Sequence, residues 1–286
     1  TLVDGMLPRG RWTAWVATAK AGKSTLALHV AASLANGRGP FDDGAVEPVE
    51  VLYLDAEMGR IDVLDRLRDD LHLSPADLGR LRYVDLVPTL NTPQGAAALL
   101  ACVAAHDVAL VVIDGLNGVV DGPEKEDATW RPLYALTIAA LKRENVAVLT
   151  IDNLGKDKTL GPRGSSVKVD KADAVIQLER TDPGVRLVRT HTRTAAYMAS
   201  IDLDVSGIDD PDEPTRYRHS TGSWIAGTAD KARELDEIGV PLDTSNATAR
   251  TMLRDASRKI GKSEVLAAAV RYRKTPGYGA QIGGER

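Results

Sequence analysis

Short apolar runs alternate with stretches of helical periodicity along the first half of the chain. The strands that this pattern predicts lie at residues 13–17, 50–55, 82–87, 108–113 and 146–151. Apolar runs with little internal alternation are typical of strands that are buried on both faces of a parallel sheet. Because the predicted strands alternate with helices, we expect an α/β fold in which helices cover both faces of the sheet.

Between these strands, apolar residues recur every three or four positions, which predicts helices that each bury one face. The positions that carry this spacing in the first two helices are Leu26, Val30 and Leu34, then Ile61, Leu64, Leu67 and Leu71. Two further helices are predicted over residues 93–106 and 128–143, the first with Pro93 in its opening turn.

The pattern changes after residue 152. A polar, cation-rich segment at 155–168 leads into a series of short predicted strands at residues 174–180, 185–191, 197–204 and 216–225. The first pair is joined by Asp182-Pro183-Gly184, a turn-forming tripeptide, so we expect an antiparallel extension of the sheet. The chain reads as helical again from residue 243.

At 286 residues the chain can hold one large α/β domain and a small appendage. The formal net charge is −4, but residues 250–286 hold nine Lys/Arg against three Asp/Glu, which gives this tail +6 and the remainder −10. A basic tail on an acidic body suits contact with a polyanion, and a solvated helical face explains it equally well. We divide the chain into a core, residues 1–228, and a basic helical segment, residues 229–286.

Cys102 is the single cysteine of the sequence, which fits a reducing cytoplasm and predicts neither a disulfide nor a thiolate metal site. No apolar run approaches the ~18 charge-free residues of a membrane span, and no signal peptide is visible. We therefore expect a cytoplasmic protein with no membrane partner. The chain begins at Thr1 rather than at a methionine, as a piece of a longer protein would.

The segment between the first strand and the first helix is the strongest candidate for chemistry. Its strand–loop–helix context suits a phosphate-binding loop, because backbone N–H groups and the helix dipole favour an anion at a helix N-terminus. Lys23 would reach the β- and γ-phosphates of ATP, and the Ser24 hydroxyl would hold Mg²⁺. Ala17 stands where the motif has its first glycine, which predicts a slightly different loop shape. The predicted nucleotide-binding residues are Ala19, Lys20, Ala21, Gly22, Lys23, Ser24 and Thr25.

Hydrolysis also needs a carboxylate that orients the metal and a group that positions water. Asp114 ends the strongest predicted strand, at the sheet edge where α/β folds bind ligands, and it is predicted to complete the Mg²⁺ site with Ser24. A turn-capping aspartate is the plainer interpretation. Glu57 lies just past the strand at 50–55 and is predicted to activate the attacking water. Asp55 is the alternative, although strand alternation can turn it away from the site.

Asn153 follows the strand at 146–151. A neutral amide at this position can hydrogen-bond both the γ-phosphate and the loop that follows, so it is a candidate sensor of hydrolysis. A turn-forming asparagine is the plainer interpretation of the same residue.

Five motifs occur in a fixed order: G-M-L-P-R-G, A-K-A-G-K-S-T, V-L-Y-L-D-A-E-M, V-V-I-D-G-L and G-K-D…R-G-S-S. Together they resemble the RepA-like hexameric replicative helicases, a group of the RecA/DnaB superfamily found in plasmids, phages and primase–helicase fusions. The resemblance spans roughly residues 2–225. It implies a RecA-like ATPase whose sites lie between the subunits of a homo-oligomeric ring, a hexamer in that family. It also implies single-stranded DNA in the pore and makes a primase domain or subunit a candidate partner.

The family's roles carry over to matching positions. Glu57 matches its water-activating acid and Asp114 its metal-site acid. Its central loop, the candidate DNA contact, corresponds to a segment whose cations are Lys156, Lys158, Arg163 and Lys168.

Two positions depart from the family pattern. Asp152-Asn153 stands where many members have His-His at the end of the sensor strand. His191-Thr192-Arg193 stands where a Lys-x-Arg usually reaches into the neighbouring subunit. Arg193 can still act as an arginine finger in trans.

The sequence thus predicts a RecA-like phosphate-loop core with a mostly parallel central sheet, an antiparallel extension and a small C-terminal helical segment. Its predicted activity is ATP- and Mg²⁺-dependent translocation on single-stranded DNA, as a ring-forming replicative helicase. Two alternatives stay open: a recombination or loader ATPase that never unwinds DNA, and a nucleotide-gated regulatory module. DNA-stimulated turnover separates motor from module, and strand displacement separates helicase from loader.

Overall fold

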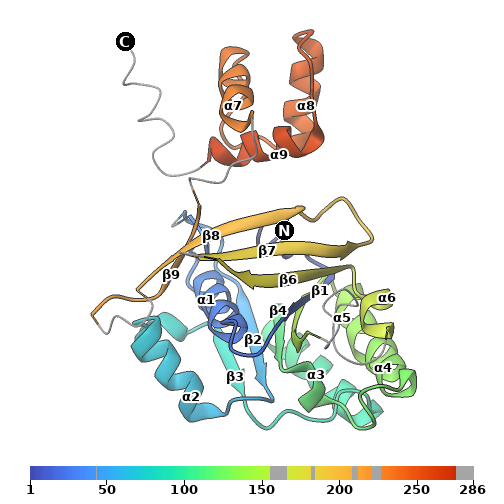
Figure 1. Cartoon of the computed structure of the whole chain (residues 1–286). Coiled ribbons are helices and arrows are strands. Elements are labelled where there is room, and N and C mark those ends of the chain that lie inside the picture. The colour runs from blue at the N-terminus through green and yellow to red at the C-terminus, as the bar shows by residue number, and fades with distance from the viewer. Residues whose placement is uncertain (43, 155–165, 182–183, 208–211, 221–226, 275–286) are drawn as a thin grey trace. The chain divides into compact units, whose positions relative to one another are not determined.

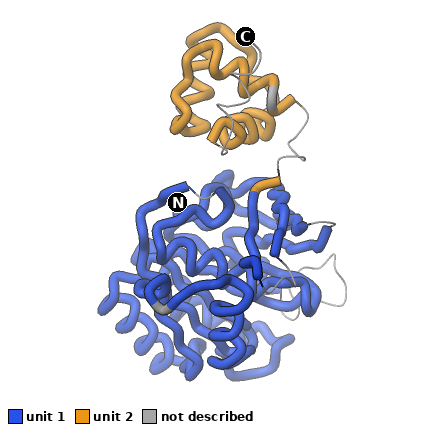
Figure 2. The backbone as a smooth tube through the Cα atoms, turned by 90° about the vertical axis from the view of Figure 1, so that its left-hand side faces the viewer, with its two compact units in different colours: residues 1–218 blue, residues 219–286 orange. Residues whose placement is uncertain are grey.

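The computed structural model describes residues 1–274 except 43, 155–165, 182–183, 208–211 and 221–226. The chain forms two compact units, residues 1–218 and residues 219–286 (Figure 2). The boundary predicted from the sequence, after residue 228, falls inside helix α7 (Thr228–Glu237). Ala232 and Leu235 of this helix belong to the core of the second unit, so the whole helix is part of residues 219–286.

One nine-stranded sheet organises the first unit, in the order β3-β2-β4-β5-β1-β6-β7-β8-β9 (Figure 1). Its strands are β1 Trp12–Ala17, β2 Glu50–Asp55, β3 Leu81–Val84, β4 Val108–Asp114, β5 Ala147–Asn153, β6 Ala174–Arg180, β7 Gly184–Thr192, β8 Ser200–Ser206 and β9 Arg216–His219. The strands from β3 to β6 pair in parallel, whereas β7 runs antiparallel to both β6 and β8. The predicted fold class is therefore confirmed.

Strand β6 belongs to the parallel part of the sheet. The sequence grouped residues 174–180 with the antiparallel strands, but β6 pairs in parallel with β1, with Thr13 opposite Ala174 and Val16 opposite Gln177. The antiparallel extension therefore begins one strand later, at β7. Strand direction depends on how the chain returns to the sheet, which composition does not encode.

Helices cover both faces of the sheet, with α1 and α2 on one face and α3, α4 and α5 on the other (Figure 1). The helices of this unit are α1 Lys23–Ala35, α2 Arg60–Asp65, α3 Pro93–His106, α4 Asp127–Pro132, α5 Ala139–Arg143 and α6 Val167–Lys171. Two π-helical segments, Arg66–Asp70 and Leu133–Ile138, extend α2 and join α4 to α5. Short 3₁₀ turns lie at Pro75–Leu78 and Leu116–Val119.

The central strands are buried on both sides because successive residues of a strand point to opposite faces. In β4, Leu110 and Val112 pack on the side of α1, whereas Val111 and Ile113 pack on the side of α3. This double burial explains why the strand is an uninterrupted apolar run in the sequence.

Helix α2 and the π-helical segment after it bury only part of the predicted apolar stripe. Leu67 and Leu71 are buried as predicted, but Ile61 and Leu64 are 76% and 50% exposed, and Val63 is buried in their place. The helix follows directly on a tight loop at residues 56–59 that hydrogen-bonds to Asp55. That attachment sets the rotation of the helix about its axis.

The second unit packs three helices, α7, α8 (Asn246–Asp255) and α9 (Ser263–Tyr272), around its own small core. Ser245 caps α8, because its Oγ accepts a hydrogen bond from the Thr248 N–H at 3.2 Å. In the described parts of both units, every helix is too short or too polar to cross a membrane.

Candidate active site

The predicted site residues meet at the carboxyl ends of the parallel strands. Strand register places Ala17 of β1 opposite Asn153 of β5, and Asp55 of β2 opposite Asp114 of β4. Because these four strands are neighbours in the sheet, side chains from positions far apart in the sequence share one edge. This is the edge at which open α/β sheets bind ligands.

The loop after β1 leads into the first turn of α1 through two residues with positive φ. Lys20 has φ 62° and Gly22 has φ 89°, a conformation that favours glycine. Helix α1 then begins at Lys23, so the first backbone N–H groups of the helix lack intrahelical acceptors and face the loop. This arrangement is a helix-terminal anion site, and Ala17 does not prevent it from forming.

Lys23 is buried at this edge, with 8% exposure. Its Nζ donates to the carbonyl oxygens of Ala17 and Thr18, at 3.5 and 3.3 Å, and to Asn153 Oδ1 at 3.2 Å. Burial lowers the pKa of Lys23, although the carboxylates of Glu57, Asp114 and Asp152 act in the opposite direction. The ammonium group therefore lies where an added anion would stabilise its charge.

Asp114 is fully buried, and its two carboxylate oxygens differ. Oδ2 accepts a hydrogen bond of 2.6 Å from the Tyr53 hydroxyl. Oδ1 has no hydrogen-bond partner among the described residues. Burial raises the pKa of Asp114, while the hydroxyls of Tyr53 and Ser24 lower it in part. A buried carboxylate oxygen without a donor is costly unless a ligand or cation meets it.

These oxygens fit the predicted metal. The Ser24 hydroxyl lies close enough to Asp114 to lower the pKa of that carboxyl, and a hydroxyl beside a carboxylate is a donor set that Mg²⁺ takes together with phosphate oxygens. A bound Mg²⁺ would neutralise charge on the β- and γ-phosphates. Ser24 and Asp114 are therefore the residues that would hold it.

Asp55 shapes the loop that carries Glu57 and does not compete for its role. Asp55 Oδ1 accepts from the N–H groups of Glu57 and Met58 at 3.0 and 2.9 Å, and Oδ2 accepts from Gly59 N at 2.8 Å and from the Tyr83 hydroxyl at 2.7 Å. These hydrogen bonds outweigh burial and lower the pKa of Asp55. A carboxylate with so many donors is a poor general base.

Glu57 itself is exposed at the sheet edge and lies close enough to interact with Lys23. Its Oε2 approaches the backbone of Gly115 so closely that any Cβ at that position would collide with it. The glycine after Asp114 therefore gives the Glu57 carboxylate room beside the metal-site acid.

Lys168 is not the DNA contact that the sequence predicts. It is 1% exposed, and its Nζ pairs with Asp152 Oδ2 at 2.7 Å and donates to Asn117 Oδ1 at 3.0 Å. The ammonium also lies 3.9 Å from the centroid of the Trp130 ring. These contacts fasten α6 to the end of β5, so the cation serves the fold rather than a DNA phosphate.

The other predicted DNA contacts, Lys156, Lys158 and Arg163, lie outside the described residues. Arg193 is exposed and follows β7, where its N–H donates to the Asp173 carbonyl at 2.9 Å. Thr192 pairs with Ala174, which pairs with Thr13 near the start of β1. Arg193 thus lies at the edge of the sheet opposite to Lys23 and away from its own phosphate loop.

Three residues at the site were not predicted from the sequence. Tyr53 and Tyr83 donate to Asp114 and Asp55, and Arg66 hydrogen-bonds to Thr25 Oγ1. The signal for Tyr53 was present, because it is the one residue with a polar group in the apolar stretch 51–54. Arg66 gave no signal, since its contact crosses between two helices.

Comparisons with known proteins bear on the family and the fold of the chain. A family model described as an AAA domain matches residues 1–159. A solved structure with a similar fold is the flagellar accessory protein FlaH from Methanocaldococcus jannaschii, at 12% identity and a TM-score of 0.51, covering 75% of this chain and 92% of that one. No curated protein sequence matches the chain.

Proposed function

The chain belongs to the AAA-domain family, and from that premise we propose that it is an ATP-hydrolysing motor that works on single-stranded DNA as a ring-forming replicative helicase. The observation that carries the ATPase part is a buried Asp114 with an unpartnered Oδ1, close to the Ser24 hydroxyl and to a buried lysine at a helix N-terminus. A nucleotide–Mg²⁺ complex supplies the anion and the cation that this arrangement lacks.

Each of three residues at the site has a separate role in the proposed hydrolysis. Lys23 binds the β- and γ-phosphates, and Asn153 holds its Nζ at 3.2 Å so that the charge points to one position. Glu57, on a loop fixed by Asp55, positions the water that attacks the γ-phosphate and takes its proton. Asn153 accepts a hydrogen bond from Lys23 and lies at the end of β5, a position that suits the proposed sensing of hydrolysis.

The position of Arg193 supports assembly in a ring. A guanidinium at the opposite sheet edge cannot reach the phosphates of its own chain, but it can stabilise charge on the γ-phosphoryl group of a neighbour. The motif order that resembles RepA-like helicases supports single-stranded DNA as the substrate track.

Turnover with and without single-stranded DNA tests the motor proposal. We expect DNA to stimulate ATP hydrolysis, and Glu57→Gln to reduce it by roughly 10²- to 10⁴-fold while ATP still binds, because a general base is lost. Glu144→Gln, the same change at an exposed glutamate before β5, is the matched control. DNA-independent hydrolysis in the parent would favour a regulatory module, and DNA-stimulated hydrolysis without strand displacement would favour a loader.

Mixing two inactive variants tests the ring. Arg193→Ala keeps an intact phosphate loop, and Lys23→Ala keeps an intact finger, so mixed assemblies contain some interfaces with both. We expect part of the ATPase rate to return on mixing. If a mixture shown to co-assemble stays inactive, Arg193 does not act in trans, and Arg163 or Arg189 becomes the candidate.

A further inference from the structure

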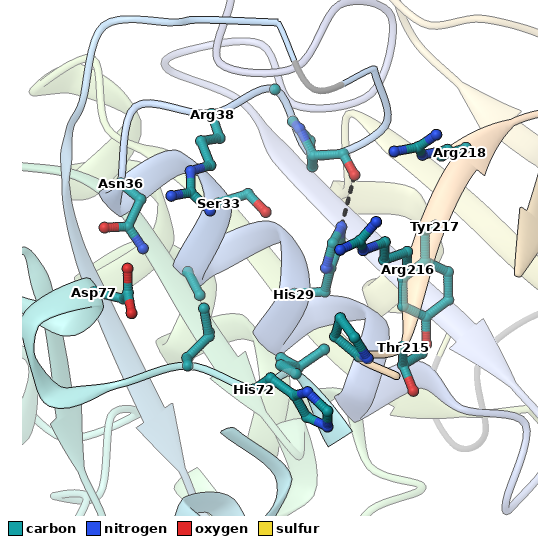
Figure 3. A pocket seen from close by; sticks show the side chains of 16 residues that line it. His29, Ser33, Asn36, Arg38, His72, Asp77, Thr215, Arg216, Tyr217 and Arg218 are labelled. Atoms are coloured by element: carbon teal, nitrogen blue, oxygen red, sulfur yellow. Dashed lines mark hydrogen bonds between the residues drawn. The ribbon is translucent and has the colours of Figure 1, made fainter. Parts of the chain in front are cut away.

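Away from the candidate active site, the first unit contains a cavity along the C-terminal half of α1 (Figure 3). It has a volume of about 520 Å³. Its walls come from three separate parts of the chain: α1 with the loop that follows it, the segment after the π-helical turn, and the start of β9. This volume lies within the range of small-molecule sites, roughly 300–1,000 Å³.

The charge around this cavity is positive. Arg38, Arg216 and Arg218 line it, and Asp77 is the one carboxylate among the lining residues that the structure describes. Arg216 belongs to β9, and its side chain forms neither a hydrogen bond nor an ion pair with any residue in the described ranges. Arg38 interacts electrostatically with Asp77. Cations held at one cavity without a matching number of acids favour an anionic ligand.

Other polar side chains line the same cavity. Ser33 projects from α1, Asn36 is the residue that caps its C-terminus, and His29 and Tyr217 face one another with ring centroids 5.0 Å apart (Figure 3). The His29 ring is fixed by a 2.6 Å hydrogen bond between Nε2 and the Pro40 carbonyl. Burial raises the pKa of Tyr217 to about 12, so its hydroxyl stays protonated and able to donate.

We propose that this cavity is a second anion site, which binds a small organic phosphate of nucleotide size. Guanidinium groups match phosphate oxygens in a bidentate manner, and more than one of them is needed to balance a multiply charged phosphate chain. The imidazole and phenol rings supply flat surfaces for the organic part of the ligand.

The cavity shares two structural elements with the phosphate loop. Helix α1 begins at Lys23 and carries His29 and Ser33 into the cavity wall. The Thr215 N–H donates to the Asp70 carbonyl at 2.6 Å, and the same π-helical segment holds Arg66 against Thr25. We therefore expect a ligand in the cavity to change ATP affinity, an effect that rests on the proposed function and is reciprocal.

Calorimetric titration of the Lys23→Met variant with pyrophosphate and with ADP tests the site, because this change disables the phosphate loop. We expect one equivalent of each probe to bind per chain. Adding Arg38→Ala and Arg216→Ala should weaken that binding by roughly tenfold or more per guanidinium, the loss typical of a charge-assisted hydrogen bond. Arg216→Lys should restore part of it.

Arg131→Ala on the same background is the matched control, because this arginine is exposed on α4 away from the cavity. Absence of probe binding to Lys23→Met, or binding that the cavity changes leave intact, would overturn the proposal. Equal binding of an acidic peptide that displaces pyrophosphate would replace it with an acidic protein partner. Failure of the ATPase proposal would instead appear as a parent without turnover, while the Lys23→Met titration stays unchanged.

Discussion

Two buried lysines lie at the carboxyl edge of the sheet, and they differ in whether a carboxylate pairs with them. Lys168 is paired with Asp152 at 2.7 Å, hydrogen-bonded to Asn117 and covered by Trp130. Lys23 forms no ion pair within the described part of the chain, and its donors meet two carbonyls and an amide. The paired lysine holds two elements together, whereas the unpaired one keeps its charge available to a ligand.

The same contrast extends to the acids. Asp152 uses both oxygens, one toward Lys168 and one toward the Asn153 N–H at 2.8 Å. Asp114 leaves Oδ1 without a donor among the residues described. Asp152 and Asp114 lie at the ends of neighbouring strands, yet only the first has a partner for each carboxylate oxygen, and an unsatisfied buried oxygen costs stability. Such uncompensated groups are typical of functional sites.

Removing Lys168 should have the largest effect on folding. Lys168→Met leaves Asp152 buried without its cation, so the free energy of unfolding should fall by about 3–5 kcal/mol. Chemical denaturation followed by circular dichroism measures this. The double variant Lys168→Met/Asp152→Leu should recover most of the loss, because a hydrophobic pair of similar volume often replaces a buried ion pair without cost. A loss below about 1 kcal/mol in the single variant would show that the pair contributes little.

Lys23→Met should strongly weaken ATP binding and barely change stability, the opposite of what is expected for Lys168→Met. ATP affinity should fall by about 10²-fold, because one cation loses charge-assisted hydrogen bonds to two phosphates. The free energy of unfolding should stay within about 1 kcal/mol of the parent, since no ion pair is broken and a buried charge is removed. Nucleotide titration and denaturation of the same preparation check both halves. Unchanged ATP affinity would mean that the loop at residues 17–25 does not bind phosphate.

Asp114→Asn should change stability only slightly, and in the stabilising direction. Burial raises the pKa of Asp114, so its charged form costs stability once the pH exceeds the ordinary pKa of an aspartate. The variant should therefore be more stable than the parent at pH 7, by about 1 kcal/mol, and should lose this advantage near pH 4 as the parent carboxyl becomes protonated.

Denaturation curves at the two pH values measure the difference. Asp152, whose pKa burial also raises, is present in both proteins and cancels in the comparison. An advantage that is equal at pH 4 and pH 7 would contradict the assignment to Asp114. Mg²⁺-dependent nucleotide binding should weaken in the same variant, because the amide is a poorer metal ligand.

The periodic parts of the fold could be predicted from the sequence. Strand β2 and helix α3 have the bounds that their apolar patterns indicate, because burial on two faces or one determines those patterns directly. Helix α7 was missed, since its sequence is mostly charged and two inward residues, Ala232 and Leu235, carry its packing. That signal is too weak to detect without the α9 partner against which they pack.

At the site, the order of motifs located Lys23, Ser24, Glu57, Asp114 and Asn153 on one edge, since parallel strands bring their carboxyl ends together. Lys168 was misassigned for a physical reason. Its charge suggested a solvent-facing loop, but its partner Asp152 lies on a different element, and pairing across elements leaves no mark on local spacing.

The hydrogen bonds of Asp55 affect what a substitution scan of this site would show. Its two oxygens accept from successive N–H groups of the Glu57 loop, and an asparagine there would present an NH₂ group to donors in place of one acceptor. Even this smallest change would disorder the loop. A scan of substitutions would therefore score Asp55 as intolerant as Glu57 itself, although Asp55 has no chemical step in the proposed mechanism. At this edge of the sheet, intolerance to mutation identifies a residue that supports the proposed water-activating group as readily as that group itself.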